Sequence, residues 1–449
     1  MTALFYTLGV VTFVVSILVS IGLHELGHMI PAKKFGGKVT QYFIGFGPTV
    51  WSKQVGETQY GVKAIPLGGF VKIVGMLPPG AAKLADSVEI DADGNRVVKV
   101  RKSNTGMFTQ LISDARAAEW ETIGPEDEPR LFYRLKWWQK VIVMAAGPTV
   151  NIVIAFLIFA PVFATYGNPS DPEVSLTVDN VAACVVPAAE DSRACTEADP
   201  PTPAVMAGLQ EGDEFLAFNG ESVSTWAQLS KLIRDNDAGA ATITILRDGT
   251  EMTVDTNTTV AARPTSPDDP KLEQVGFLGV TPTVQRATGG VGYTLGQMGH
   301  MTVETVQALA HLPTKVWGVG RAIVGLQERA IDSPVSIVGG GRFAGETVSH
   351  DTFPVKEKAV FLLMLVAGFN FFIGMFNFVP LLPLDGGHIA GALWEALRRG
   401  WAKLRGRPDP GYVDVARLLP IAYVVGLSLL VMGVVLIVGD LVVPLHVPE

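Results

Sequence analysis

The sequence predicts an α-helical polytopic membrane protein with four transmembrane helices, a membrane-associated β-hairpin or small sheet, and one domain outside the membrane. Its 449 residues are 48% hydrophobic and 17% charged, a more apolar balance than ordinary soluble proteins show. A transmembrane helix needs roughly 20 mostly apolar residues. Four segments meet that requirement: 4–23, 141–163, 359–380 and 418–438.

The first apolar segment is expected to stay in the mature protein as a membrane helix. No charged residue lies between Leu4 and Leu23, and the stretch ends in His24, Glu25 and His28. A cleaved signal peptide needs a basic start, which "MTALFY" lacks, and its cleavage point would fall on the histidines.

The region that follows alternates apolar and polar residues. In "YFIGFGPTVWSKQVGETQYGVKAIPLGGFVKIVGM" the alternation has period two between turn signals, which predicts a β-hairpin or small sheet. Gly68 and Gly69 would permit close backbone approach or a bend, or they merely turn the chain. Further on, Trp137 and Trp138 lie among cations just before the second apolar segment, as suits the lipid interface.

The basic residues predict the orientation of the chain. Residues 31–140 hold sixteen Lys and Arg, and the loop "ALRRGWAKLRGRPDPGYVDVAR" holds six more, so both are expected to be cytoplasmic. Both termini then face outward. Residues 165–285 carry nineteen Asp and Glu against six Lys and Arg and form the exported domain. This acidity argues against a nucleic-acid partner, although a merely soluble surface also explains it.

The exported domain resembles a bacterial-type PDZ domain, present in one copy. Within "PAVMAGLQEGDEFLAFNGESVSTWAQLSKLIRD" a short helix, a Gly-Asp turn, a strand and an amphipathic helix with Trp226, Leu229 and Ile233 follow one another. The strands "ATITILRDG" and "EMTVDT" continue the pattern. PDZ domains bind extended peptides by adding a strand to a sheet; a degenerate copy would only plug an entrance.

The two cysteines of the chain, Cys184 and Cys195, both fall in this exported domain. Their spacing in "ACVVPAAEDSRAC" suits a disulfide that closes a small loop in an oxidising compartment. The alternative is two independent thiols.

These observations give the predicted order of parts along the chain. They are a first transmembrane helix (1–30), a membrane-associated β region (31–76), a cytoplasmic loop with an interfacial segment (77–140), a second transmembrane helix (141–164), the extracytoplasmic domain (165–285), a connecting region (286–358), a third transmembrane segment (359–390), a cytoplasmic loop (391–417) and a fourth transmembrane helix (418–440).

The end of the first segment carries the arrangement HExxH. His24 and His28 are four residues apart, so on a helix they share one face and can bind one metal ion, with Glu25 beside them to move a water proton. The alternative is a pair of helix-end side chains that reach to water. Ionisable groups inside a membrane are unfavourable and are by default a functional hypothesis.

A catalytic zinc ion needs three protein ligands and one open position. The acidic side chain of "GMFNFVPLLPLDGGHIAGAL" that lies in an apolar setting is Asp385. His388 competes for the role, but an unpaired carboxylate there would be less favourable than a neutral imidazole. Asp385 is therefore the favoured third ligand, with His388 as a helix cap or a partner of a ligand.

Together "HELGH", "AGPTVN" and "NFVPLLPLDGGH" resemble the site-2 protease family of intramembrane zinc metalloproteases. The resemblance implies that His24, His28 and Asp385 are zinc ligands and that Glu25 is the general base. It also implies that Asn377 contacts the substrate or supports a metal ligand. It also points to Pro380, in the same motif, as a substrate-binding residue. Bacterial members with a PDZ domain cleave membrane-anchored anti-sigma factors and remnant signal peptides. Some relatives carry two PDZ domains in tandem, whereas one is predicted here.

The resemblance implies a multi-pass enzyme of the inner, cytoplasmic membrane that binds Zn²⁺ and hydrolyses transmembrane segments of single-span proteins. Because a helical substrate must unwind to be cut, the edge strand from Ala64 to Val71, which contains Gly68 and Gly69, is expected to pair with it. Two alternatives are a membrane scaffold with a structural metal, which would need a fourth ligand, and a transporter, which would show repeated hydropathy.

Overall fold

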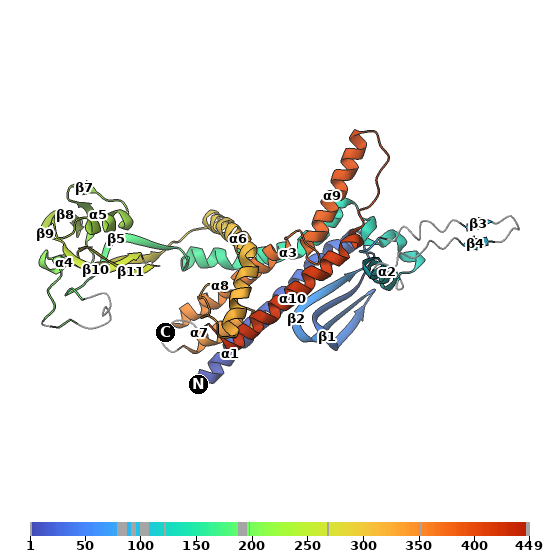
Figure 1. Cartoon of the computed structure of the whole chain (residues 1–449), viewed down its shortest axis with the longest axis horizontal. Helices are drawn as coiled ribbons and strands as arrows, with labels where there is room; N and C mark the ends of the chain where they lie inside the picture. Colours follow the sequence, from blue (N-terminus) through green and yellow to red (C-terminus); the bar gives the residue numbers. More distant parts are fainter. Residues whose placement is uncertain are drawn as a thin grey trace. The chain divides into compact units, whose positions relative to one another are not determined.

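The computed structural model describes residues 2–78, 88–90, 96–98, 107–120, 123–186, 195–196, 198–266, 269–350 and 353–445. The chain forms two compact units, the first made of Met1–Pro161 and Val291–Glu449 and the second of Val162–Gly290 (Figure 1). Each unit contains its own clusters of buried apolar side chains.

Unit 1 is mainly helical and includes one large hairpin. Its elements are α1 (Thr2–Lys34), β1 (Val39–Val55), β2 (Thr58–Ile73), β3 (Val88–Ile90), β4 (Arg96–Val98), α2 (Met107–Trp120), η1 (Pro125–Arg130), η2 (Phe132–Arg134), α3 (Trp137–Thr165), α6 (Val291–Ile323), α7 (Ile337–Ser349), α8 (Val355–Asn377), α9 (Asp385–Leu404), η4 (Val415–Leu418) and α10 (Leu419–Val442).

Four stretches of helix in the described part of the chain are long and apolar enough to cross a membrane. They are Ala3–Lys34, Trp137–Thr165, Val355–Asn377 and Val415–Val442. The first, second and fourth contain the predicted apolar segments and extend beyond them. The third begins before the predicted segment 359–380 and ends three residues short of it, so four apolar helices are confirmed with one shifted boundary.

The third apolar segment, expected as one piece over 359–390, is divided between two helices. Helix α8 ends at Asn377, and α9 begins at Asp385 after a turn with the sequence "VPLLPL". A proline lacks the backbone N–H and clashes with the preceding turn. Helix α3 runs through Pro148 and Pro161, which are 13 residues apart, but Pro380 and Pro383 are only three apart, which disfavours a continuous helix there. Much of the segment 391–417, expected as a loop, is helical because α9 extends to Leu404.

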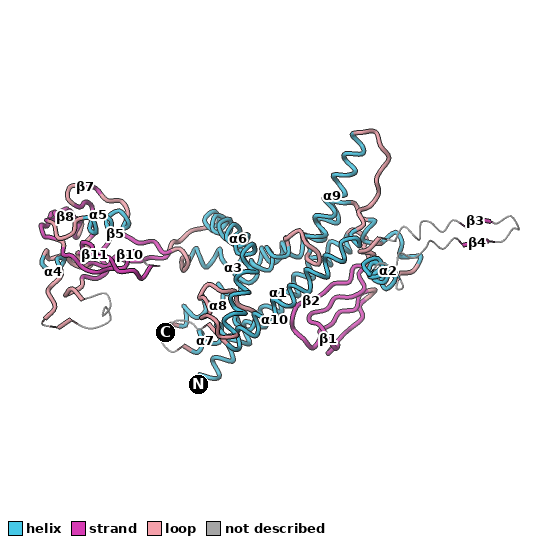
Figure 2. The backbone as a smooth tube through the Cα atoms, in the orientation of Figure 1, coloured by secondary structure: helices cyan, strands magenta, loops and turns pink. Residues whose placement is uncertain are grey.

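Strands β1 and β2 form the predicted antiparallel hairpin, and the hairpin folds back on itself. Phe43 of β1 pairs with Phe70 on one side and with Gly61 on the other, so the two long strands make four adjacent segments (Figure 2). Gly45 and Gly68 take φ values of 90° and 101°, which glycine adopts without strain, and they lie where the strands bend. The end of β2 is therefore an edge of the sheet.

The hairpin and helices α1 and α3 share one buried apolar cluster. Val39 and Ile73 of the hairpin pack with Met29 of α1 and with Val143 and Met144 of α3. Burial of such side chains stabilises by about 1.5–3 kcal/mol each. This packing fixes the edge of β2 against the helix that carries the HExxH residues.

A buried polar cluster joins α10 to the start of α7. The Asp440 carboxylate lies 2.7 Å from the Arg329 guanidinium and accepts hydrogen bonds from the backbone N–H groups of Ser336 and Gly339. A carboxylate at a helix N-terminus compensates the unpaired N–H groups there. The segment "SPVSIVGGG", to which the sequence assigned no chemistry, is thus an anchoring point for α10.

Unit 2 is built on a mixed-length antiparallel sheet with the strand order β12-β5-β6-β8-β9, and β7 pairs with β6. Phe215, Leu229, Ile243 and Ile245 form the fully buried centre of its core. Its elements are β5 (Pro172–Val181), α4 (Pro203–Met206), β6 (Glu214–Phe218), β7 (Glu221–Ser222), α5 (Trp226–Asp235), β8 (Ala240–Arg247), β9 (Thr250–Asn257), β10 (Thr259–Ser266), β11 (Asp269–Phe277) and β12 (Val280–Arg286).

Candidate metal centre

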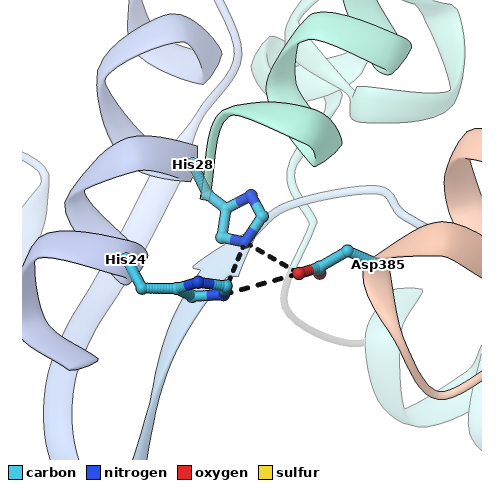
Figure 3. Close-up of side chains that lie close together, drawn as sticks. All are labelled: His24, His28 and Asp385. Carbon is cyan, nitrogen blue, oxygen red and sulfur yellow. Dashed lines mark hydrogen bonds and ion pairs between the residues drawn. The ribbon is translucent and has the colours of Figure 1, made fainter. Parts of the chain in front are cut away.

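Three side chains from two helices converge in unit 1. His24 and His28 lie one turn apart on α1, and their Nε2 atoms are 3.2 Å from each other. Asp385, the first residue of α9, directs its Oδ2 atom at both, at 3.4 Å from His24 and 3.3 Å from His28 (Figure 3). Both histidines are buried. Among the described residues, these three are the His, Cys, Asp or Glu side chains grouped closely enough to hold one metal ion.

The spacing of the three atoms fits a zinc ion. Zinc bonds to imidazole nitrogen and carboxylate oxygen are about 2.0–2.1 Å long, and a tetrahedron with such bonds has edges of roughly 3.3–3.4 Å. The three observed separations are 3.2, 3.3 and 3.4 Å. Two imidazoles and one carboxylate are also a donor set used by catalytic zinc, with the fourth vertex left for water.

Helix α3 orients both imidazole rings. His24 Nδ1 lies 3.3 Å from Asn151 Oδ1, and His28 Nδ1 lies 2.8 Å from the carbonyl oxygen of Val143. Both partners are acceptors, so each Nδ1 carries the proton and each Nε2 keeps its lone pair for the metal. Sequence reasoning missed these partners. Asn151 belongs to "AGPTVN", and a polar residue in an apolar helix is a signal in the sequence that could have indicated its role. The backbone carbonyl of Val143 gives no such signal, because every residue has one.

Two glycines allow α1 and α3 to approach each other closely at this point. A Cβ atom on Gly147 would lie 2.2 Å from His28 Nε2, and one on Gly27 would lie 2.8 Å from the carbonyl oxygen of Ala146. Small residues at such crossings let membrane helices pack backbone to backbone. Gly147 is therefore part of the centre's wall, although it offers no ligand atom.

A cavity of about 570 Å³ opens onto the metal centre. Glu25 lines it, and the edge of β2 runs alongside, since a Cβ atom on Gly69 would lie 3.0 Å from Glu25 Cγ. Gly68 and Asn377 line the same cavity.

The remaining predicted residues fall into different places. Pro380 is exposed and does not line the cavity, whereas Pro383, which sequence reasoning missed, does. His388 lines the cavity but is not a member of the three-ligand group. In unit 2, Cys184 and Cys195 are bonded to each other.

Comparison with known proteins gives a consistent result. The family model "Peptidase family M50" matches residues 12–416. The chain is 33% identical to the zinc metalloprotease Rip1 of Mycolicibacterium smegmatis, over 98% of this chain and 99% of that one. It is 32% identical to Rip1 of Mycobacterium tuberculosis H37Rv over the same shares. It is 26% identical to the zinc metalloprotease RasP of Geobacillus kaustophilus over 87% of this chain and 90% of the relative.

These relatives are named zinc metalloproteases, and the three converging ligands with an adjacent glutamate supply what such an enzyme requires. The chain is accordingly a zinc metalloendopeptidase and not a scaffold or a transporter. Its four apolar helices make it membrane-embedded. The chain thus belongs to peptidase family M50, the site-2 protease family.

Proposed function

We propose that this enzyme hydrolyses peptide bonds within the transmembrane segments of single-span membrane proteins, as in regulated intramembrane proteolysis. The observation that carries the proposal is the position of His24, Glu25 and His28 on a helix apolar enough to cross a membrane. Ionisable groups at that depth are unfavourable by a few kcal/mol each and mark functional sites. Substrates of this class include anti-sigma-factor-like proteins and remnant signal peptides.

The residues of the cavity divide the work of hydrolysis. When bound, zinc supplies a Lewis acid that lowers the pKa of water to about 7. Glu25 accepts the proton of the attacking water and then delivers it to the leaving amine. Asn377, which lines the cavity, has an amide that can donate a hydrogen bond to a substrate carbonyl. Asn151 and the Val143 carbonyl keep the two imidazoles in the binding tautomer.

The general-base role is tested by Glu25→Gln. The amide cannot accept a proton, so cleavage of a single-span substrate should fall by a factor of about 100 or more, while zinc per chain stays unchanged because the three ligands remain. The control Glu57→Gln changes a glutamate at the β1–β2 turn, whose carboxylate forms an exposed ion pair with Arg130 and is not one of the metal-site residues. It should leave both quantities unchanged. An active Glu25→Gln enzyme would refute the assignment.

We propose further that the substrate, once unwound, pairs with the edge of β2. A transmembrane helix satisfies its own backbone hydrogen bonds, so an unwound segment needs new partners, and a free strand edge offers them. The strand predicted for this role, from Ala64 to Val71, bends at Gly68. The segment after the bend, from Gly69 to Ile73, is such an edge, and it borders the cavity beside Glu25.

Cross-linking tests this pairing. With Val71→Cys in a Glu25→Gln background, a substrate that carries one cysteine in its transmembrane segment should form a disulfide with the enzyme when a copper–phenanthroline oxidant is added. The native cysteines, bonded in unit 2, do not interfere. The control Trp51→Cys lies on the segment at the opposite edge of the sheet and should not cross-link. Equal cross-linking at both positions would contradict strand pairing.

Unit 2 is proposed to act as the PDZ domain that selects or excludes substrates. A cavity of about 270 Å³ lies between α5 and the strands that follow it, lined by Trp226, Ile233, Phe277 and Val280 among others. Arg234 and Arg263 also line it. A partly apolar groove beside a strand suits an extended peptide. A gating role for this unit predicts that its deletion changes substrate choice and leaves cleavage of short substrates intact.

The orientation is proposed from the charge distribution. Residues 31–140 hold sixteen Lys and Arg, whereas 165–285 hold nineteen Asp and Glu. By the positive-inside rule, unit 2 and both termini lie outside the cytoplasm, and the metal centre lies towards the cytoplasmic side of the cell membrane.

A further inference from the structure

Helix α9 presents an apolar stripe that no part of the described chain covers. Successive helical residues are offset by 100°, so the five exposed apolar side chains of α9 fall within one stripe about 100° wide. The fractional exposures range from 45% for Leu393 to 85% for Leu404. The stripe comprises Leu393, Trp394, Leu397, Trp401 and Leu404.

The opposite side of α9 is fixed to the rest of unit 1. Ala392, Glu395 and Ala402 are buried on that side. The Glu395 carboxylate lies 2.7 Å from the Lys140 ammonium of α3, and both side chains are almost completely buried. Removing one member of such a buried pair destabilises strongly. The stripe therefore faces away from the rest of unit 1, and the buried Lys140–Glu395 pair prevents α9 from rotating about its axis to bury it.

Cations flank the stripe. Arg405 lies over the Trp401 ring, with its guanidinium carbon 4.3 Å from the ring centroid. Lys403 and Arg407 are exposed at the same end. Within the described residues, no carboxylate forms an ion pair with any of these three cations. Their charge is thus available to an anionic partner.

The chain position of α9 indicates which partner that is. Helix α9 follows α8 and precedes α10, two helices able to span a membrane, so it emerges at the bilayer surface. Leucine and tryptophan on one face, with Lys and Arg at its border, are the composition of helices that lie in the lipid interface. Three charged residues in the middle of α9, Glu395, Arg398 and Arg399, rule α9 out as a further span.

We propose that α9 docks on the anionic phospholipid surface of the membrane. Its leucines and tryptophans insert at the boundary between head groups and acyl chains, while Lys403, Arg405 and Arg407 bind lipid phosphates. Because Asp385 is the first residue of this helix, the same rigid element that holds a zinc ligand is held at its other end by lipid.

Hydrogen–deuterium exchange on the full-length enzyme tests the proposal. The protein is reconstituted in nanodiscs of phosphatidylcholine alone or with phosphatidylglycerol, and exchange is followed over the last turns of α9. Each cation near an anionic surface contributes a factor of about five. Because three cations act together, we expect exchange there to slow by a factor on the order of 100 with phosphatidylglycerol. It should return to the phosphatidylcholine rate in high salt, which screens such contacts.

Variants separate the surface from general charge. The triple variant Lys403→Gln, Arg405→Gln and Arg407→Gln should lose the effect of phosphatidylglycerol, while its zinc content shows that it is folded. If the triple variant does not fold, the single variant Lys403→Gln should reduce the slowing of exchange by a factor of about five. The control Lys231→Gln removes an exposed cation of unit 2 and should keep the whole effect. Equal exchange in both lipids, an unaffected triple variant, or the same slowing by inorganic phosphate in phosphatidylcholine would overturn the proposal.

Discussion

Replacement of Gly147 by alanine should remove zinc from the enzyme without unfolding it. The added methyl group would lie 2.2 Å from His28 Nε2, whereas ordinary contact begins at 3.4 Å. His28 must therefore move by about 1.2 Å, the difference between these two values. Zinc ligands tolerate deviations of only about 0.2 Å, so the centre loses its geometry.

The fold itself has little reason to fail. The three atoms nearest to the new methyl group all belong to the His28 imidazole, at the far end of a side chain, and alanine favours a helix over glycine by roughly 1 kcal/mol. Disturbing a partner of a ligand commonly lowers metal affinity 10–100-fold. Because a ligand itself is displaced here, we expect a loss of about 100-fold or more, with cleavage lost in parallel.

The assay measures zinc per chain, zinc affinity by competition with a chelator, and cleavage of a single-span substrate on the same preparation. Gly368→Ala is the matched control, since Gly368 lies on apolar helix α8 and a Cβ atom there meets nothing within 4 Å. It should behave as the wild type. Normal zinc affinity in Gly147→Ala would refute the claim that the α1–α3 contact shapes the centre.

Two further predictions concern the third ligand and unit 2. Asp385→Ala should lose zinc and activity while His388→Ala keeps zinc, because His388 stands outside the three-ligand group; zinc analysis of both variants decides, and the reverse result would exchange their roles. Burial alone would raise the pKa of Asp213, but the Arg247 guanidinium and a backbone N–H hold this pKa below its usual value. A carboxyl with a lowered folded-state pKa stabilises above its unfolded pKa, near 4, and this contribution disappears as the pH falls. Asp213→Asn should therefore lower the free energy of unfolding of unit 2 by about 2 kcal/mol at pH 7. The difference in this free energy between variant and wild type, measured by hydrogen exchange in β8, should become smaller below about pH 4. A difference that does not change with pH would contradict the role given to the Asp213 charge.

The sequence was sufficient for features that depend on local periodicity. His24 and His28 share a helix face because their spacing is one turn, and Asp385 is predicted as a ligand because it is a carboxylate in an apolar setting. The division of the third segment was also within reach, since Pro380 and Pro383 stand in the middle of it.

Contacts between distant parts of the chain were beyond the sequence. Nothing local to Asn151 tells that its amide meets His24, and the Val143 carbonyl that orients His28 has no side-chain identity at all. Period-two alternation predicts strands. It does not predict that the hairpin folds back on itself so that Phe43 pairs with Phe70 on one side and with Gly61 on the other. Such pairings arise from packing against α1 and α3, and a single sequence does not encode them in any short window.

The distance along the chain between the ligands has a consequence for biosynthesis. His24 and His28 are made and inserted among the first residues, whereas Asp385 lies in the last fifth of the chain. During insertion the two histidines alone cannot form a three-ligand zinc site. The nascent chain therefore lacks a complete three-ligand centre until α9, which carries Asp385, has been synthesised.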